Sequence, residues 1–177
     1  WKLIEKYKIN NKLDLEENGF TKLNNIIPLE RFTKFEKIIC DLIISSVKRL
    51  PKDLRLKFEA EKFTHRQLPH EGLIKLFELS HEYEQIVVDA LTVSKTTYDL
   101  LLDENLINSI LDLLSINDSN HLSINEVFVR VDLPSNYQNL SKCIELPSHQ
   151  ESSYFKDNID FHNAFVVWIP IFDCEPI

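Results

Sequence analysis

The spacing of apolar residues over the first two thirds of the chain predicts a series of amphipathic helices. In residues 29–50 apolar side chains recur every three or four positions, and Pro51 ends the pattern. The same spacing predicts further helices in residues 69–79, 82–93 and 99–114. In residues 82–93 we expect the apolar face to comprise Tyr83, Ile86, Val87, Ala90 and Leu91. Residues 52–67 are highly charged and predict a solvated helix or loop.

After residue 120 the pattern changes to one that is typical of strands. In residues 124–133 apolar and polar positions alternate, so that Val127, Val129 and Val131 share one face. Further strands are expected at residues 143–146 and in the apolar stretch 164–172, and a short one between Gly19 and Pro28. The last stretch needs a partner strand, so we expect the chain to continue beyond Ile177.

Helices followed by strands predict the α+β class, with a helical layer that supports a sheet or barrel. The length of 177 residues fits one domain, in which residues 1–120 are the mainly helical support and residues 121–177 the first barrel strands.

The composition excludes several classes of protein. A net charge of −8 argues against a nucleic-acid partner, because neutralising phosphates requires clustered Lys and Arg. No apolar run is long enough to span a membrane, and no signal peptide is evident. With only two glycines, at positions 19 and 72, no phosphate-binding glycine loop and no GxSxG nucleophile elbow can be written. The three cysteines are far apart, which favours free thiols and a cytoplasmic protein.

The residues that point to chemistry lie in the segment that begins at Pro147. In an extended backbone residues i and i+2 project to the same side, so His149 and Glu151 can present an imidazole and a carboxylate to one point. Such a pair is two thirds of the 2-His-1-carboxylate site of non-haem Fe(II) oxygenases. His162 could close a local triad with this pair.

This segment resembles the phytanoyl-CoA dioxygenase family of Fe(II)- and 2-oxoglutarate-dependent oxygenases. The resemblance is carried by Pro147-Ser148-His149-Gln150-Glu151, then Tyr154-Phe155, then Phe165-Val166-Val167-Trp168-Ile169-Pro170-Ile171, with Phe128-Val129-Arg130-Val131-Asp132 upstream. It covers about the last third of the chain. The family mostly has aspartate where this chain has Glu151, and one extra methylene still allows a metal bond.

The resemblance implies a double-stranded β-helix, a jelly-roll or cupin-like barrel that is incomplete in these 177 residues. It implies Fe(II) bound by His149 and Glu151, with 2-oxoglutarate as co-substrate, and dioxygen and a small organic molecule as the other reactants. It places Trp168 and Arg130 near the co-substrate and lets Gln150 and Tyr154 line the same pocket. The second histidine and the arginine that binds 2-oxoglutarate are expected beyond Ile177.

Two other readings stay open. A barrel of the same kind could serve only as a binding or scaffold domain, and the residues that follow Ile177 would distinguish it from an enzyme. A cupin-like isomerase or metal-binding protein ranks last, because the usual HxH pair and glycine-rich turns are missing. The remaining histidines are expected to be structural or solvated: His65, His70, His81 and His121. Substrate identity and oligomeric state do not follow from the sequence.

Overall fold

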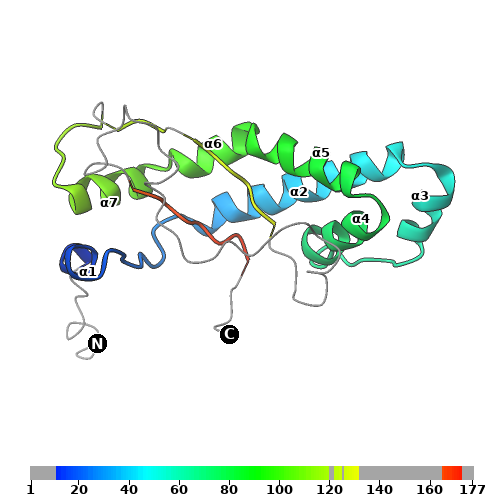
Figure 1. The fold of residues 1–177 in the computed structure, drawn as a ribbon, viewed down its shortest axis with the longest axis horizontal. Coiled ribbons are helices and arrows are strands. Elements are labelled where there is room, and N and C mark those ends of the chain that lie inside the picture. Colours follow the sequence, from blue (N-terminus) through cyan, green and yellow to red (C-terminus); the bar gives the residue numbers. More distant parts are fainter. Residues whose placement is uncertain (1–10, 120–121, 125, 132–164, 173–177) are drawn as a thin grey trace. The chain divides into compact units, whose positions relative to one another are not determined.

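The computed structural model describes residues 11–119, 122–124, 126–131 and 165–172. The chain divides into two compact units, residues 1–130 and 131–177, and each is described by itself. In the described part of the first unit (Figure 1) the elements are α1 (Asn11–Asn18), α2 (Leu29–Arg49), α3 (Lys52–Glu59), the π-helical turn η2 (Leu68–Gly72), α4 (Leu73–Leu79), α5 (His81–Thr92), α6 (Lys95–Leu101) and α7 (Glu104–Leu114).

Helix α2 is the centre of the first unit. Prolines bound it on both sides: Pro28 is its N-cap, and Pro51 follows its C-cap Leu50. Pro51 ends the helix because proline disfavours helical backbone in the residue before it. Its buried side chains recur at helical spacing: Phe35, Ile39, Cys40, Ile43, Ser46 and Val47. This stripe packs against α5, α6 and η2, and Figure 1 shows α2 and α5 side by side.

The core forms where α2, α4 and α5 meet. Four side chains there are almost completely inaccessible to solvent: Ile43, Leu76, Val87 and Leu91. Helix α4 continues directly from η2, in which the backbone N–H of Gly72 bonds to the carbonyl oxygen of Gln67 at 3.3 Å. The predicted helix at residues 69–79 is therefore confirmed as a π-helical turn that leads into α4.

The predicted face of α5 is confirmed in part: Val87 and Leu91 are buried, but the buried face is turned toward Glu84 and Val88. Its buried side chains are Glu84, Val87, Val88 and Leu91, whereas Ile86 is exposed. Positions 84, 87, 88 and 91 have helical spacing, but a face chosen by its apolar residues alone leaves out position 84, which is a glutamate. The face that packs on the core therefore includes a carboxyl group.

The predicted α+β class is wrong for the part of the chain that the structure describes, which is all-α. Residues 126–131 and 165–172 have no strand pairing, and the expected short strand between Gly19 and Pro28 is a loop in which Asn25 has a φ of 56°. A double-stranded β-helix, or jelly roll, is thus not found among the described residues. That all 177 residues form one oxygenase domain stays a prediction.

The alternation near residue 128 nevertheless has a structural counterpart. Val127, Val129 and Val131 are half-buried, whereas Phe128 is 75% exposed. The backbone N–H of Val129 donates to Thr92 Oγ1, a side-chain atom of α5, at 3.3 Å. Alternation predicted which side chains turn inward, but a strand also needs a neighbouring backbone to pair with, and here the contact is to a helix.

No helix within the described ranges combines the length and the apolar character that a bilayer crossing requires.

Candidate functional site

Most of the predicted metal site lies outside the described residues. This holds for the two proposed ligands, His149 and Glu151, for Gln150 and Tyr154, and for the rival ligand His162. Their roles stay predictions that depend on the sequence motif.

The structure describes two of the predicted site residues, Arg130 and Trp168. Trp168, in the second unit, is 72% exposed, whereas a ring that shields a co-substrate would be largely buried. Arg130 is exposed at the end of the first unit. The exposure of Trp168 does not match a shielded co-substrate site, and the co-substrate roles of both residues stay predictions.

The described residues contain no group of three His, Cys, Asp or Glu side chains that could hold a metal ion. Cys40, a possible nucleophile, is buried in α2. Burial, followed by the nearby acids Asp41 and Glu36, raises the pKa of the Cys40 thiol, which keeps it protonated and weakly reactive. Chemistry in the described helices would have to come from other side chains.

The most unusual ionisable group in the helical unit is Glu84. Its side chain is 7% exposed, and its Oε2 lies 3.0 Å from Nδ1 of His81, one turn earlier in α5. The His81 ring also meets Phe77 of α4 edge-on, with ring centroids 5.1 Å apart. Burial raises the pKa of the Glu84 carboxyl above its ordinary value, and the hydrogen bond from His81 only partly opposes this effect.

This raised pKa predicts a pH-dependent stability. Between pH 4.5, the ordinary value, and the higher pKa of the folded state, the folded protein holds a proton that the unfolded chain has lost. Stability from this group is therefore present at lower pH and lost as the pH rises through the window. We expect Glu84→Gln to have a higher free energy of unfolding than the wild type at pH 7, with a difference that shrinks below pH 4.5.

Urea unfolding of both proteins between pH 3.5 and 8 measures this difference. Glu82→Gln, an exposed change on the same helix, is the control and should leave the pH profile unchanged. A Glu84→Gln profile that stays parallel to the wild type would contradict the assignment.

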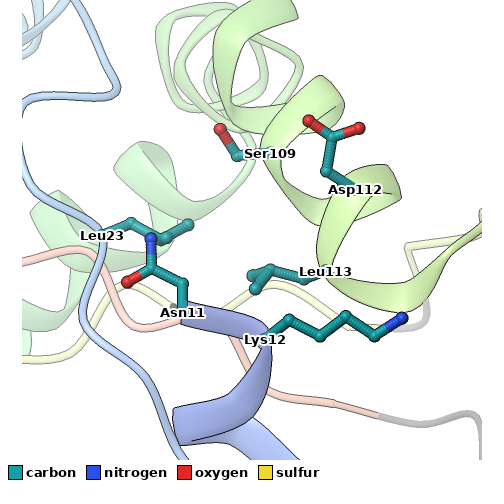
Figure 2. A pocket seen from close by; sticks show the side chains of 6 residues that line it. All are labelled: Asn11, Lys12, Leu23, Ser109, Asp112 and Leu113. Atoms are coloured by element: carbon teal, nitrogen blue, oxygen red, sulfur yellow. The ribbon is translucent and has the colours of Figure 1, made fainter. Parts of the chain in front are cut away.

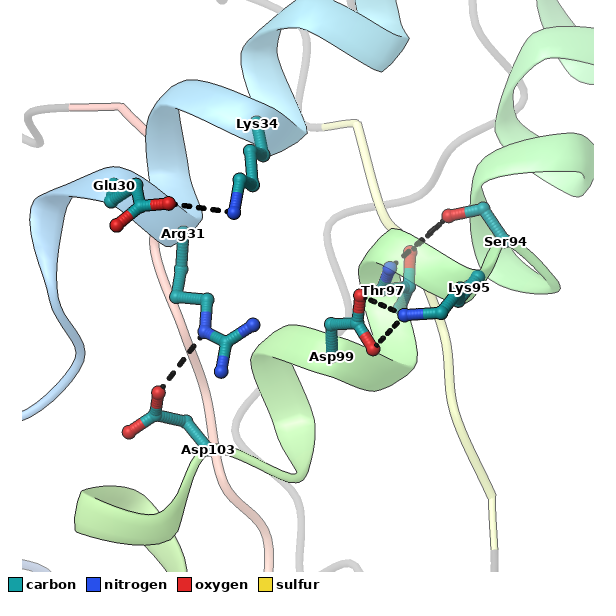
Figure 3. Close-up of polar contacts among 8 residues, drawn as sticks. All are labelled: Glu30, Arg31, Lys34, Ser94, Lys95, Thr97, Asp99 and Asp103. Carbon is teal, nitrogen blue, oxygen red and sulfur yellow. Dashed lines mark hydrogen bonds and ion pairs between the residues drawn. The ribbon is translucent and has the colours of Figure 1, made fainter.

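A second set of polar contacts lies at the start of α2, in α6 and at the N-cap of α7 (Figure 3). Arg31 Nε donates to Asp103 Oδ2 at 3.2 Å, Lys34 pairs with Glu30 at 2.6 Å, and Lys95 Nζ lies 2.6 Å from Asp99 Oδ1. Hydrogen bonding to Lys95 lowers the pKa of Asp99. Lys34–Glu30 lies within α2 and Lys95–Asp99 within α6, so only Arg31–Asp103 links two helices. Each of these three cations has a carboxylate partner, so the cluster offers no unpaired positive charge to an anion.

Asp103 has two roles in this cluster. It is the N-cap of α7, where its Oδ1 accepts from the backbone N–H of Asn105 at 3.1 Å, and its carboxylate is 5% exposed beside Arg31. We expect Asp103→Ala to lower the free energy of unfolding by about 2 kcal/mol, since a cap contributes about 1 kcal/mol and a partly exposed ion pair up to about 1 kcal/mol.

Asp103→Asn separates these roles, because asparagine caps a helix as well as aspartate but carries no charge. We expect it to cost about half as much as alanine, and the cost to shrink in high salt, which screens the ion pair. Equal losses for both variants at every salt concentration would show that the cap contributes nothing. Thermal or urea unfolding provides the measurement.

A shallow pocket of about 210 Å³ lies where α1 and the loop after it meet α7 (Figure 2). It is lined by Asn11, Lys12, Leu23, Ser109, Asp112 and Leu113. Lys12 Nζ donates to Ser115 Oγ, and Ser109 Oγ donates to the backbone oxygen of Asn105 at 2.7 Å. The serine proton is thus held by the helix backbone and not by a base, so this arrangement does not activate a nucleophile.

Comparison of the chain with family models, with curated proteins and with solved structures finds no match.

Proposed function

We propose that this chain supplies two metal ligands, His149 and Glu151, to a non-haem Fe(II)- and 2-oxoglutarate-dependent dioxygenase that hydroxylates a small organic substrate. The observation that carries the proposal is the order of residues in the last third of the chain. The pair His149 and Glu151 follows Pro147, and an aromatic pair and an apolar segment with Trp168 come after it. This order resembles the metal-binding segment of the phytanoyl-CoA dioxygenase family.

The two donor groups suit ferrous iron. An imidazole nitrogen and a carboxylate oxygen are the ligand types of the 2-His-1-carboxylate site, which leaves positions open for other ligands. Glu151 in place of aspartate keeps the charge and the oxygen donor, and its extra methylene requires a slightly larger separation between backbone and metal. Thiolates, which select other metals, are not part of the motif.

The chain's own residues have defined tasks in this proposal. His149 must be neutral to coordinate through a ring nitrogen, and Glu151 must be ionised so that its charge offsets that of the metal. Gln150 and Tyr154 carry hydrogen-bonding groups that can orient a ligand nearby. The iron, when bound, supplies the activation of dioxygen that couples the conversion of 2-oxoglutarate to succinate and carbon dioxide with hydroxylation of the substrate.

The proposal does not depend on the β-helix that the sequence predicted, because it rests on the local motif alone. It fits a reducing environment, in which iron stays ferrous and thiols stay free. Cys40 is such a free thiol, and we place the protein in the cytoplasm for this reason.

Anaerobic titration tests the proposal before the substrate is known. Fe(II) and 2-oxoglutarate are added to the protein as its own cell makes it, and the visible charge-transfer absorption of a 2-oxo acid bound to Fe(II) is recorded. We expect this absorption only when protein, iron and 2-oxoglutarate are all present, and we expect admission of dioxygen to remove it with formation of succinate.

Two other outcomes of this titration would argue against a dioxygenase. Iron binding without the charge-transfer absorption would favour a domain that binds metal but does not catalyse. Absence of both iron binding and succinate would exclude the proposed function. N-oxalylglycine, an unreactive analogue of 2-oxoglutarate, serves as the control that should bind without giving succinate.

A further inference from the structure

We draw no further inference here: the strongest candidate, the run of exposed apolar side chains at residues 165–168, is an apolar face without a partner in the part of the chain that the structure describes, and nothing there shows what covers it.

Discussion

Replacing His149 with alanine is expected to abolish the iron-dependent conversion of 2-oxoglutarate to succinate. The loss should be at least about 100-fold, because removing groups that merely support a metal ligand already costs about 10- to 100-fold in affinity or activity. Fe(II) affinity should fall together with activity, since the imidazole is proposed to bind the metal itself. Succinate release and anaerobic Fe(II) binding are the two measurements.

Matched variants show whether the effect is specific to the motif. His162→Ala removes the nearby rival imidazole and should leave both readouts unchanged. Glu151→Asp keeps a carboxylate and should retain part of the activity, whereas Glu151→Gln removes the charge and should not. Succinate formation that survives His149→Ala but not His162→Ala would move the ligand assignment to His162.

Truncating Leu76 is expected to have the largest effect on the stability of the helical unit. This α4 side chain is completely buried (0% exposed), and Leu→Ala changes at such positions cost about 2–5 kcal/mol because they leave a cavity. We expect about 3–4 kcal/mol here, a large part of the roughly 5–15 kcal/mol that stabilises a typical domain. Urea unfolding followed by circular dichroism measures the loss.

Leu56→Ala is the matched control on the neighbouring helix α3, where the side chain is 55% exposed. This change should alter the free energy of unfolding by less than about 0.5 kcal/mol, as is usual at exposed positions. If the two variants unfolded at the same urea concentration, Leu76 would not be part of the core.

The helices could be predicted because their signal is local. Apolar residues at three- and four-residue spacing place one face of α2 on the core. Pro51 sets the end of the helix through its effect on the residue before it, which does not depend on tertiary contacts. The orientation of α5 was predicted less well. The apolar residues alone predict a face that includes Ile86, whereas the buried face includes Glu84. A glutamate is seldom buried without a partner, and here its carboxylate contacts His81.

The strands predicted at residues 19–28, 124–133 and 164–172 are wrong where the structure describes them, because strand pairing is not local, whereas the one predicted at 143–146 lies outside the described residues. Val127 and Val129 are half-buried as their alternation predicts, but the backbone N–H of Val129 bonds to Thr92 of a helix and not to another strand. Alternation specifies which side of a segment is apolar, and it says nothing about which backbone lies alongside. Residues 165–172 were assigned to a strand from a continuous apolar run, which likewise does not specify a partner strand.

The candidate site, too, was predictable only as far as its signals are local. His149 and Glu151 were identified from their residue types and a spacing of two. This local pattern names two ligands, but it does not identify the third, which must come from another part of the fold. The proposed place of Trp168 near the co-substrate depends on a barrel around it, and its side chain is exposed. In contrast, the contact between the buried Glu84 carboxyl and the exposed His81 ring follows from their spacing of three on one helix, although the predicted helix began at residue 82 and so left His81 out.

The most direct measurement is the position of the iron itself. Crystals of the intact protein, loaded anaerobically with Fe(II) and 2-oxoglutarate, would be measured at the iron absorption edge, and the anomalous signal locates the metal. We expect one strong peak within bonding distance of a ring nitrogen of His149 and a carboxylate oxygen of Glu151. A peak elsewhere, or these two side chains directed to different surroundings with no metal between them, would contradict the proposed function.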